Sequence, residues 1–370
     1  MSSDSRQDAM GTLCSLQILR GAAAWMVVYH HYMQIFHNWE HATTAGAIFT
    51  EHGGFGVDIF FVISGFIIFW SLHLKGYSAR EFLIRRLLRI VPCYWFMTLV
   101  FVIFIEILSL PHHMPVSWDI KSLVLSLLFL PHQHMSGMGL FPVLAVGWTL
   151  NFEVFFYLGL SGVLSRVRRH WFAVWSGILF ALPVMFANST FPYSSILKSN
   201  LLYEFAFGMS AGYLYLRLRN VQQWRQVLLG IVLLLVGGWI YWAGITHLSP
   251  FDFSKMRFIW RIGDLTRPVS SLLFIGSALA FEASLPRGLL SRMLCYLGDI
   301  SYSTYLVHVP AGIIVFNLVK VLRFSVAEVW TLGAYTILTL TLSVLSYRWI
   351  ETGQAVIFLK QGLLPQRARS

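Results

Sequence analysis

Long apolar runs recur along almost the entire chain of 370 residues. Each has about 17 to 25 residues, enough for a helix to cross a hydrocarbon core about 30 Å thick. The runs are continuous rather than alternating, which favours helices over the strands of a membrane barrel. Hydrophobic residues make up 57% of the chain and charged residues 12%, against roughly 25% charged in soluble domains. The sequence therefore predicts an all-α polytopic membrane protein without a sizeable soluble domain.

Eleven apolar segments are candidate spans. They are residues 14–35, 55–74, 91–110, 118–131, 145–164, 171–187, 199–216, 227–245, 267–283, 298–320 and 327–347. Basic clusters follow at residues 75–89, 166–169, 217–225, 287–292 and 360–369. The positive-inside rule places these clusters on the cytoplasmic face.

The positions of the basic clusters limit the number of crossings. Two clusters on one face must be separated by an even number of crossings, yet three apolar runs lie between Arg89 and Arg166. The weakest run is 118–131, whose length is typical of a re-entrant or interfacial segment. We therefore expect about ten transmembrane helices, with both termini in the cytoplasm and outward-facing loops at 36–54 and 244–266.

This topology gives three expected regions. They are an N-terminal tail at 1–13, a membrane domain at 14–350 and a basic C-terminal tail at 351–370. The net charge of +11 is explained by the topology, so no nucleic-acid partner is expected. The three cysteines lack CxxC spacing, and the sequence indicates neither a disulfide framework nor a metal site.

Charged and titratable side chains lie inside the first span. Arg20 and His31 are eleven residues apart, which on an ideal helix places them on one stripe about 16 Å apart, while His30 points about 80° away. Ionisable groups inside a bilayer are rare and are functional candidates by default. The stripe is compatible with a channel from the cytoplasm, and equally with an arginine and histidines that reach the two membrane interfaces.

Two acidic residues stand in apolar surroundings on other spans. Asp58 opens the second span, and Glu153 is flanked by Trp148 and several phenylalanines. A buried acid needs a partner, and a histidine or arginine from another helix would provide it. Four complementary charged groups on three helices indicate a polar cavity.

Two further segments contain polar residues beside apolar runs. Arg85, Arg86 and Arg89 precede Pro92, and they either anchor the helix or bind an anion, because arginine forks match phosphate geometry. The segment "LGDISYSTYLVHVP" contains Tyr302 and His308. Its hydroxyl groups are explained at least as simply by hydrogen bonds between helices.

Six segments, taken together, resemble the acyltransferase-3 family of integral membrane acyltransferases. They are "LQILRGAAAWMVVYHH", "GGFGVDIFFVISGFII", "RRLLRIVPCYW", "VGWTLNFEVFFYL", "LGDISYSTYLVHVP" and "YRWIE", and they occur in the family's order over nearly the whole chain. The resemblance is strongest to members that modify exopolysaccharides.

The resemblance implies roles for particular residues. It selects Arg20 and His31, rather than His30, as the essential pair of the first helix. The family's arginine motif corresponds to Arg85, Arg86 and Arg89, and its acidic position to Glu153.

The resulting expectation is transfer of an acyl group, most simply acetyl, from cytoplasmic acyl-CoA to a hydroxyl group of a surface or lipid-linked glycan. His31 would deprotonate the acceptor or receive the acyl group itself. Glu153 or Asp58 would orient its imidazole. Arg20 and the three arginines of the third span would hold the CoA phosphates or the oxyanion.

No bound cofactor is expected beyond acyl-CoA as donor substrate. Membrane lipid is the expected surrounding partner, and the sequence does not indicate the oligomeric state. Further candidates for the site are His30, Trp148, Tyr302 and His308. A proton-coupled transporter, or an acyltransferase with a small-molecule acceptor, would use similar residues.

Overall fold

The structure is a computed structural model. It describes residues 13–41, 43–108, 118–137, 139–191, 193–218, 222–247, 265–286, 288–322 and 328–364. Within these ranges the chain forms helices and turns but no strand, which confirms the all-α prediction. The tails expected at 1–13 and 351–370 and the loop expected at 244–266 lie partly outside the described residues.

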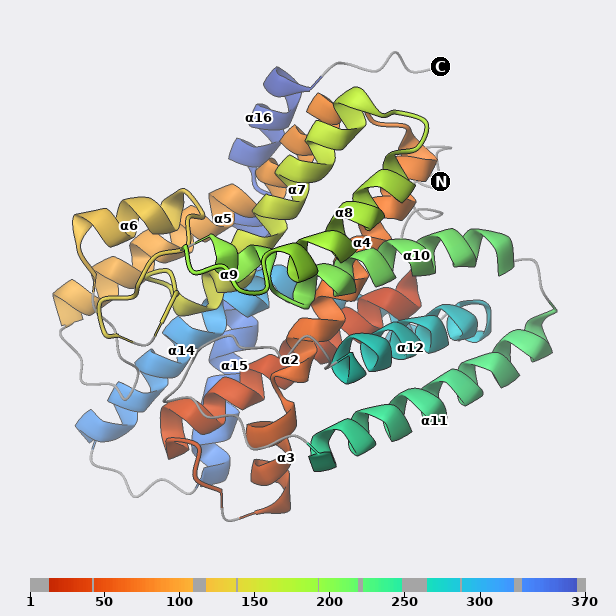
Figure 1. Cartoon of the computed structure of the whole chain (residues 1–370). Helices are drawn as coiled ribbons and strands as arrows, with labels where there is room; N and C mark the ends of the chain where they lie inside the picture. The colour runs from red at the N-terminus through yellow and green to blue at the C-terminus, as the bar shows by residue number, and fades with distance from the viewer. Residues whose placement is uncertain are drawn as a thin grey trace. The chain divides into compact units, whose positions relative to one another are not determined.

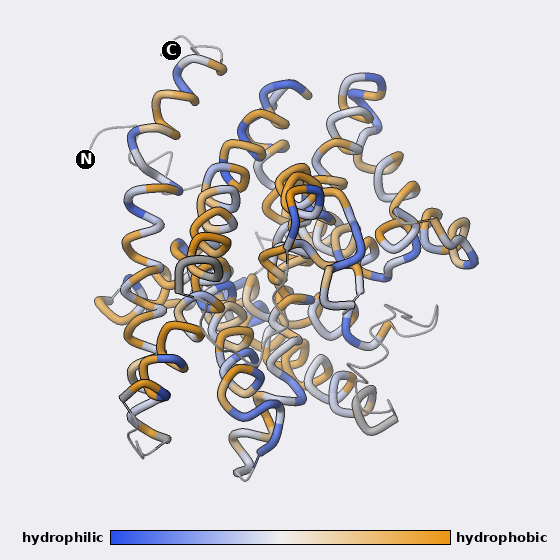
Figure 2. The backbone as a smooth tube through the Cα atoms, turned by 90° about the vertical axis from the view of Figure 1, so that its left-hand side faces the viewer, coloured by the Kyte–Doolittle hydropathy of each residue, from blue (hydrophilic) through white to orange (hydrophobic). Residues whose placement is uncertain are grey.

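Five helical stretches of the described chain are long and apolar enough to cross a membrane. They are Phe55–Lys75, Ala79–Phe104, Arg225–Ala243, Ser301–Val321 and Val329–Leu363. Figure 2 shows apolar residues along most of the helices. The five stretches support a membrane protein, but they do not confirm the expected ten crossings.

Helices also form at the other expected spans, although they are shorter or less apolar. They are α2 (Cys14–His37), α7 (Trp148–Arg166), α8 (Trp171–Met185), α10 (Leu201–Leu218) and α12 (Thr266–Phe281). The weak segment at 118–131 forms only α6 (Ile120–Leu127), with eight residues. At a rise of about 1.5 Å per residue, a helix of this length reaches less than half of the hydrocarbon thickness. This length fits the expectation that the segment is not a full crossing.

The chain divides into two compact units. The first takes its described residues from Met1–Ala24, Phe55–Tyr77 and Arg166–Asp299, and the second from Trp25–Gly54, Ser78–Ser165 and Ile300–Ser370. Helix α2 contributes its first half to the first unit and its second half to the second. Each unit is described separately below.

The first unit is built on two helix pairs. Helix α4 (Phe55–Lys75) packs along α10, and α11 (Gln223–His247) packs along α12 (Figure 1). Helix α12 also contacts both α4 and α10. The first unit further includes the short α9 (Ser194–Leu197), the turn η3 (Glu282–Ser284) and α13 (Leu289–Asp299).

Glycines allow α4 and α10 to pack with their backbones in contact. A Cβ atom on Gly208 of α10 would overlap the carbonyl oxygen of Val62, and one on Gly65 of α4 would overlap that of Phe205. Small residues permit this close approach between apolar helices, where dispersion contacts replace a hydrophobic driving force. The reciprocal glycines therefore fix the spacing of the helix pair that supports Asp58.

The beginning of α2 is attached to η3 and α13 of the first unit. The backbone N–H groups of Cys14 and Ser15 donate hydrogen bonds of 3.1 and 2.8 Å to the carboxylate of Glu282. A carboxylate at this position satisfies two of the unpaired N–H groups of a helix N-terminus and complements its dipole. Cys14 also forms a disulfide with Cys295 of α13, with a Cα–Cα distance of 5.6 Å. The expectation that no disulfide is present was therefore wrong, because the two cysteines are 281 positions apart and only tertiary packing brings them together.

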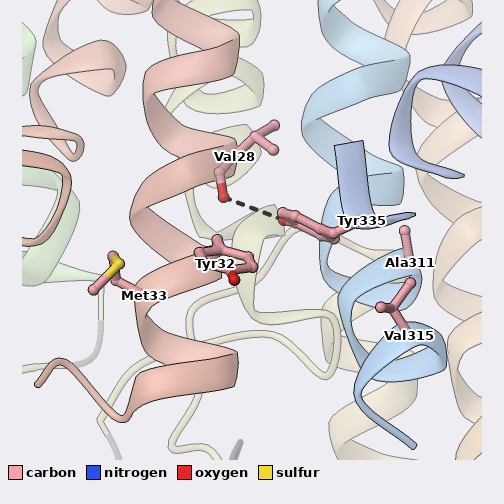
Figure 3. Close-up of a cluster of buried hydrophobic side chains, with 6 residues drawn as sticks. All are labelled: Val28, Tyr32, Met33, Ala311, Val315 and Tyr335. Carbon is pink, nitrogen blue, oxygen red and sulfur yellow. Dashed lines mark hydrogen bonds between the residues drawn. The ribbon is translucent and has the colours of Figure 1, made fainter. Parts of the chain in front are cut away.

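The second unit packs the end of α2 against α14 (Ser301–Leu322) and α15 (Glu328–Ser346). Its core cluster comprises Val28, Tyr32, Met33, Ala311, Val315 and Tyr335 (Figure 3). The hydroxyl group of Tyr335 donates a hydrogen bond of 3.2 Å to the carbonyl oxygen of Val28. This cluster holds the segment of α2 that contains the two histidines against α14.

The remaining elements of the second unit include a long helix that contains a proline. Helix α5 (Ala79–Leu108) continues through Pro92, so it begins well before the expected start at residue 91. The second unit also contains α3 (Thr44–His52), the turn η1 (Ala145–Gly147), a π-helical turn at Tyr347–Glu351 and α16 (Gln354–Leu363), which packs on α5.

Candidate functional site

A pair of histidines joins α2 to α14 in the second unit. The Nε2 atom of His308 lies 3.1 Å from the Nδ1 atom of His31. The same Nδ1 atom of His31 is 3.0 Å from the carbonyl oxygen of Val27, and the Nδ1 atom of His308 is 3.3 Å from that of Thr304. His308 is 0% exposed, whereas His31 is partly exposed. Of the two residues, His31 is the less deeply buried.

The neighbouring His30 has a different environment. Its Nδ1 atom lies 3.0 Å from the carbonyl oxygen of Phe49 in α3, and its ring packs against Trp39 at a centroid distance of 4.7 Å. A side chain on Gly53 would clash with the Cβ atom of His30. His30 therefore contacts the α3 segment, while His31 faces α14.

A hydroxyl network links α14 to the start of α7. The hydroxyl group of Tyr305 donates a hydrogen bond of 2.9 Å to the carbonyl oxygen of Val146, and that of Thr149 donates one of 3.2 Å to Tyr305. The rings of Tyr305 and His308 lie 5.8 Å apart. Trp148, which begins α7, packs its ring edge-on against Phe152 at 5.9 Å. The network therefore positions the tryptophan segment beside the helix that contains His308.

Glu153 lies one turn further along α7. The hydroxyl group of Tyr157 donates a hydrogen bond of 2.8 Å to its carboxylate. Arg86 and Arg89 interact electrostatically with the same tyrosine. The acidic and basic groups expected at the site therefore gather around Tyr157 within the second unit.

The three arginines of α5 share one part of its surface but have separate neighbours. The guanidinium group of Arg85 donates two hydrogen bonds, of 3.1 and 2.9 Å, to the buried Glu81. Arg86 lies over the ring of Phe82 at 5.8 Å. Lys360 of α16 is close enough to Arg85 and Arg89 to repel them electrostatically. The structure thus adds a lysine, from the other end of the chain, to the arginine cluster.

A buried polar cluster surrounds the π-helical turn. The hydroxyl group of Ser303 donates a hydrogen bond of 2.9 Å to the buried carboxylate of Glu351, and Ser346 donates one of 3.1 Å to Ser303. The neighbouring Tyr302 donates a hydrogen bond of 2.7 Å to the carbonyl oxygen of Ile90. The hydroxyl groups of this segment therefore tie α14 to α5 and to the π turn, as the simpler interpretation of the sequence predicted.

Two predicted site residues, Asp58 and Arg20, belong to the first unit. Asp58 is 2% exposed and pairs with Arg267 of α12, whose Nη2 atom lies 2.8 Å from its Oδ2 atom. Glu204 of α10 is 1% exposed and lies within hydrogen-bonding reach of Asp58. Asp58 thus has the arginine partner from another helix that its burial requires.

Arg20 is also part of the first unit and is buried. Its Nη1 atom donates a hydrogen bond of 3.1 Å to the side chain of Gln17, which in turn donates one of 2.9 Å to Asp299. The structure therefore gathers His30, His31 and His308 in the second unit, and Glu153 with Arg86 and Arg89. The relation of Arg20 and Asp58 to the histidines stays a prediction.

The residues of these clusters that were missed in the sequence include Arg267, Glu204, Lys360 and Glu351. Arg267 and Glu204 each begin an apolar helix, as Asp58 does, and this shared position was the available signal. Lys360 was interpreted only as part of a basic tail, and Glu351 only as the end of a motif. Among the described residues, no group of three or more His, Cys, Asp or Glu side chains is arranged to hold a metal ion.

The second unit therefore contains the groups that acid–base chemistry on a hydroxyl group requires. The imidazole of His31, a partly exposed residue, contacts the buried imidazole of His308, and a separate cluster of cations is suited to an anionic ligand.

Comparison with known proteins gives the family. The family model described as "Acyltransferase domain", of the acyltransferase-3 type, matches residues 15–348. The exopolysaccharide production protein ExoZ of Rhizobium meliloti (strain 1021) is 34% identical over 259 residues, which cover 69% of this chain and 75% of ExoZ. The acyltransferase MdmB of Streptomyces mycarofaciens is 30% identical over 321 residues, which cover 80% of this chain and 78% of MdmB. No solved structure matches the chain significantly. The chain therefore belongs to the acyltransferase-3 family.

Proposed function

We propose that this protein is a membrane O-acyltransferase that moves an acyl group, most simply acetyl, from acyl-CoA to a hydroxyl group of a bacterial surface glycan. Membership of an acyltransferase family supports the reaction class. The similarity to ExoZ, an exopolysaccharide production protein, supports a glycan acceptor. The observation that carries the proposal is the geometry of His31, a partly exposed residue whose Nδ1 atom contacts Val27 and His308.

The proposed reaction needs a base because a hydroxyl group is a weak nucleophile near neutral pH. His31 accepts the hydroxyl proton as the oxygen attacks the thioester carbonyl carbon. The new C–O bond forms, the C–S bond breaks, and the proton returns from the imidazolium to the CoA thiolate. The products are the acyl ester and free CoA thiol. A route in which His31 first receives the acyl group uses the same residue and the same overall balance.

The proposed donor carries several phosphate groups, which need cationic partners. Arg85, Arg86, Arg89 and Lys360 supply them at one part of the second unit. Planar guanidinium groups bind phosphate oxygens in pairs, and Lys360 adds a point charge. Under the positive-inside rule this cluster belongs to the cytoplasmic face of the inner membrane, where acyl-CoA is made.

The test is acetyl-CoA turnover by the purified full-length protein in lipid nanodiscs, followed by release of CoA thiol with and without a glycan acceptor. We expect His31→Ala to lower turnover by about 100-fold or more. His30→Ala is the matched control, because it removes an imidazole of the same helix that contacts α3 instead of α14. Retained turnover in the control and loss in His31→Ala would support the proposal.

Two results of the same experiment would contradict the proposal or favour its alternative. A wild-type protein that neither binds nor consumes acetyl-CoA would exclude the acyltransferase reaction. Movement of protons with a solute across the membrane by such a protein would favour the transporter instead.

A further inference from the structure

The histidine pair has a geometry that decides where its protons lie. Each imidazole turns its Nδ1 atom back to a carbonyl oxygen four residues earlier in its own helix, His31 to Val27 and His308 to Thr304. A carbonyl oxygen can only accept a hydrogen bond. Each Nδ1 atom must therefore carry a proton to make a favourable contact.

The contact between the two rings follows from this assignment. With its proton on Nδ1, a neutral His308 has a bare Nε2 atom, which accepts from the Nδ1–H of His31 at 3.1 Å. The opposite assignment, with His308 donating from Nε2, would leave two bare nitrogens facing two carbonyl oxygens at 3.0 and 3.3 Å. Both of those contacts would be repulsive, so the arrangement with both protons on Nδ1 is the stable one.

We propose that His308 is a positioning residue that holds His31 as the Nδ1–H tautomer and leaves the Nε2 lone pair of His31 ready to accept a proton. This inference rests on the proposed function, in which His31 is the base. His308 is completely buried and does not meet the reactants itself. Its part is that of the third group in a catalytic triad, which fixes the tautomer and direction of the imidazole and stabilises its protonated form.

The surroundings of His308 fit a fixed rather than a mobile ring. Its ring lies 5.8 Å from that of Tyr305, whose hydroxyl group is hydrogen-bonded to Val146. The core cluster of Figure 3, which includes Tyr32 of α2 and Ala311 of α14, also packs these two helices together. The charged and titratable groups that the structure places beside His31 are His30 and His308, so no carboxylate of the described second unit competes for its Nδ1 proton.

Two substitutions at position 308 distinguish a role of His308 in positioning His31 from a role in packing alone. In His308→Gln the amide can donate to Thr304 or accept from His31 near the original Nε2 position, whereas His308→Leu fills similar space without any polar atom. Asn317→Leu is the matched control. Asn317 is also buried on α14 and also donates to a carbonyl oxygen four residues earlier, at 2.8 Å, but it belongs to neither the histidine pair nor the cation cluster.

The first measurement is acetyl-CoA turnover with the Michaelis constant for acetyl-CoA and the pH profile of kcat. We expect His308→Leu to lower kcat by about 10- to 100-fold, the loss typical when the outer partner of a metal-bound histidine is removed, with little change in the Michaelis constant. His308→Gln should recover most of kcat. A His308→Leu protein as active as the Asn317→Leu control would overturn the positioning role, and so would a His308→Gln protein as inactive as His308→Leu.

The second measurement reads the tautomer directly and does not depend on activity. In protein labelled with ¹⁵N in its histidine rings, the signals missing from His31→Ala belong to His31. We expect a protonated Nδ1 and a bare Nε2 in the wild type. The reverse pattern would refute the inference even if the leucine variant does not fold. Absence of acetyl-CoA turnover in the wild type would instead refute the proposed function. The tautomer measurement would still test whether His308 holds His31 in the Nδ1–H form.

Discussion

The ion pair between Asp58 and Arg267 should make a large contribution to the stability of the first unit. Asp58 and Glu204 are almost completely buried on neighbouring helices, and the guanidinium group of Arg267 is the cation beside them. Arg267→Met removes this charge while preserving most of the side-chain volume. It leaves two carboxyl groups in a poorly hydrated interior.

The magnitude follows from the burial of the groups. Removing one partner of a buried ion pair costs about 3–5 kcal/mol in free energy of unfolding. Because the Arg267 side chain retains 23% exposure, we expect a value near the lower end, about 3 kcal/mol. Asp58→Asn should cost less, about 1 kcal/mol, because Glu204 can ionise beside Arg267 in its place. The double variant should be less destabilised than the sum of the two, by about 1–3 kcal/mol.

The assay is reversible unfolding in mixed detergent micelles with increasing dodecyl sulfate, followed by far-ultraviolet circular dichroism. Arg225→Met, on an exposed position of α11, is the matched control and should stay within about 0.5 kcal/mol of the wild type. If Arg267→Met is no more destabilising than Arg225→Met, the argument that this pair stabilises the helix bundle is wrong.

Two further predictions concern packing and the disulfide. Gly208→Ala should destabilise the protein by about 1–3 kcal/mol, because the new methyl group meets the α4 backbone. Gly177→Ala, where nothing lies within 4 Å, should be neutral or slightly stabilising in the same assay. The bond between Cys14 and Cys295 predicts one reactive thiol, that of Cys93, after denaturation without reductant and three after reduction. Maleimide labelling and intact mass measure this number, and three thiols without reductant would contradict the bond.

Local sequence patterns predicted most of the helices. The second expected span, at 55–74, is the helix Phe55–Lys75, and the last, at 327–347, is Glu328–Ser346. The pattern was less reliable at Pro92, because a proline interrupts the hydrogen bonding of a helix without always ending it. A run of apolar residues therefore indicates where a helix lies better than where it begins.

The partners of the polar residues were harder to predict. Burial alone required a cation beside Asp58, but nothing local to that residue points to Arg267, which lies on another helix far along the chain. The same reason explains why the link between Cys14 and Cys295 was missed, and why His308 was named without its contact to His31. These pairings are properties of helix packing, and a single sequence contains little information on it.

The glycine contacts between α4 and α10 restrict how the first unit can open. At Gly65 and Gly208 main chain packs against main chain, so no side chains lie between the two helices at these two positions. Separating the helices at these positions would cost both backbones their dispersion contacts. We therefore expect lipid-borne molecules to enter this unit between other helices. We also expect α4 and α10 to move together as one rigid pair.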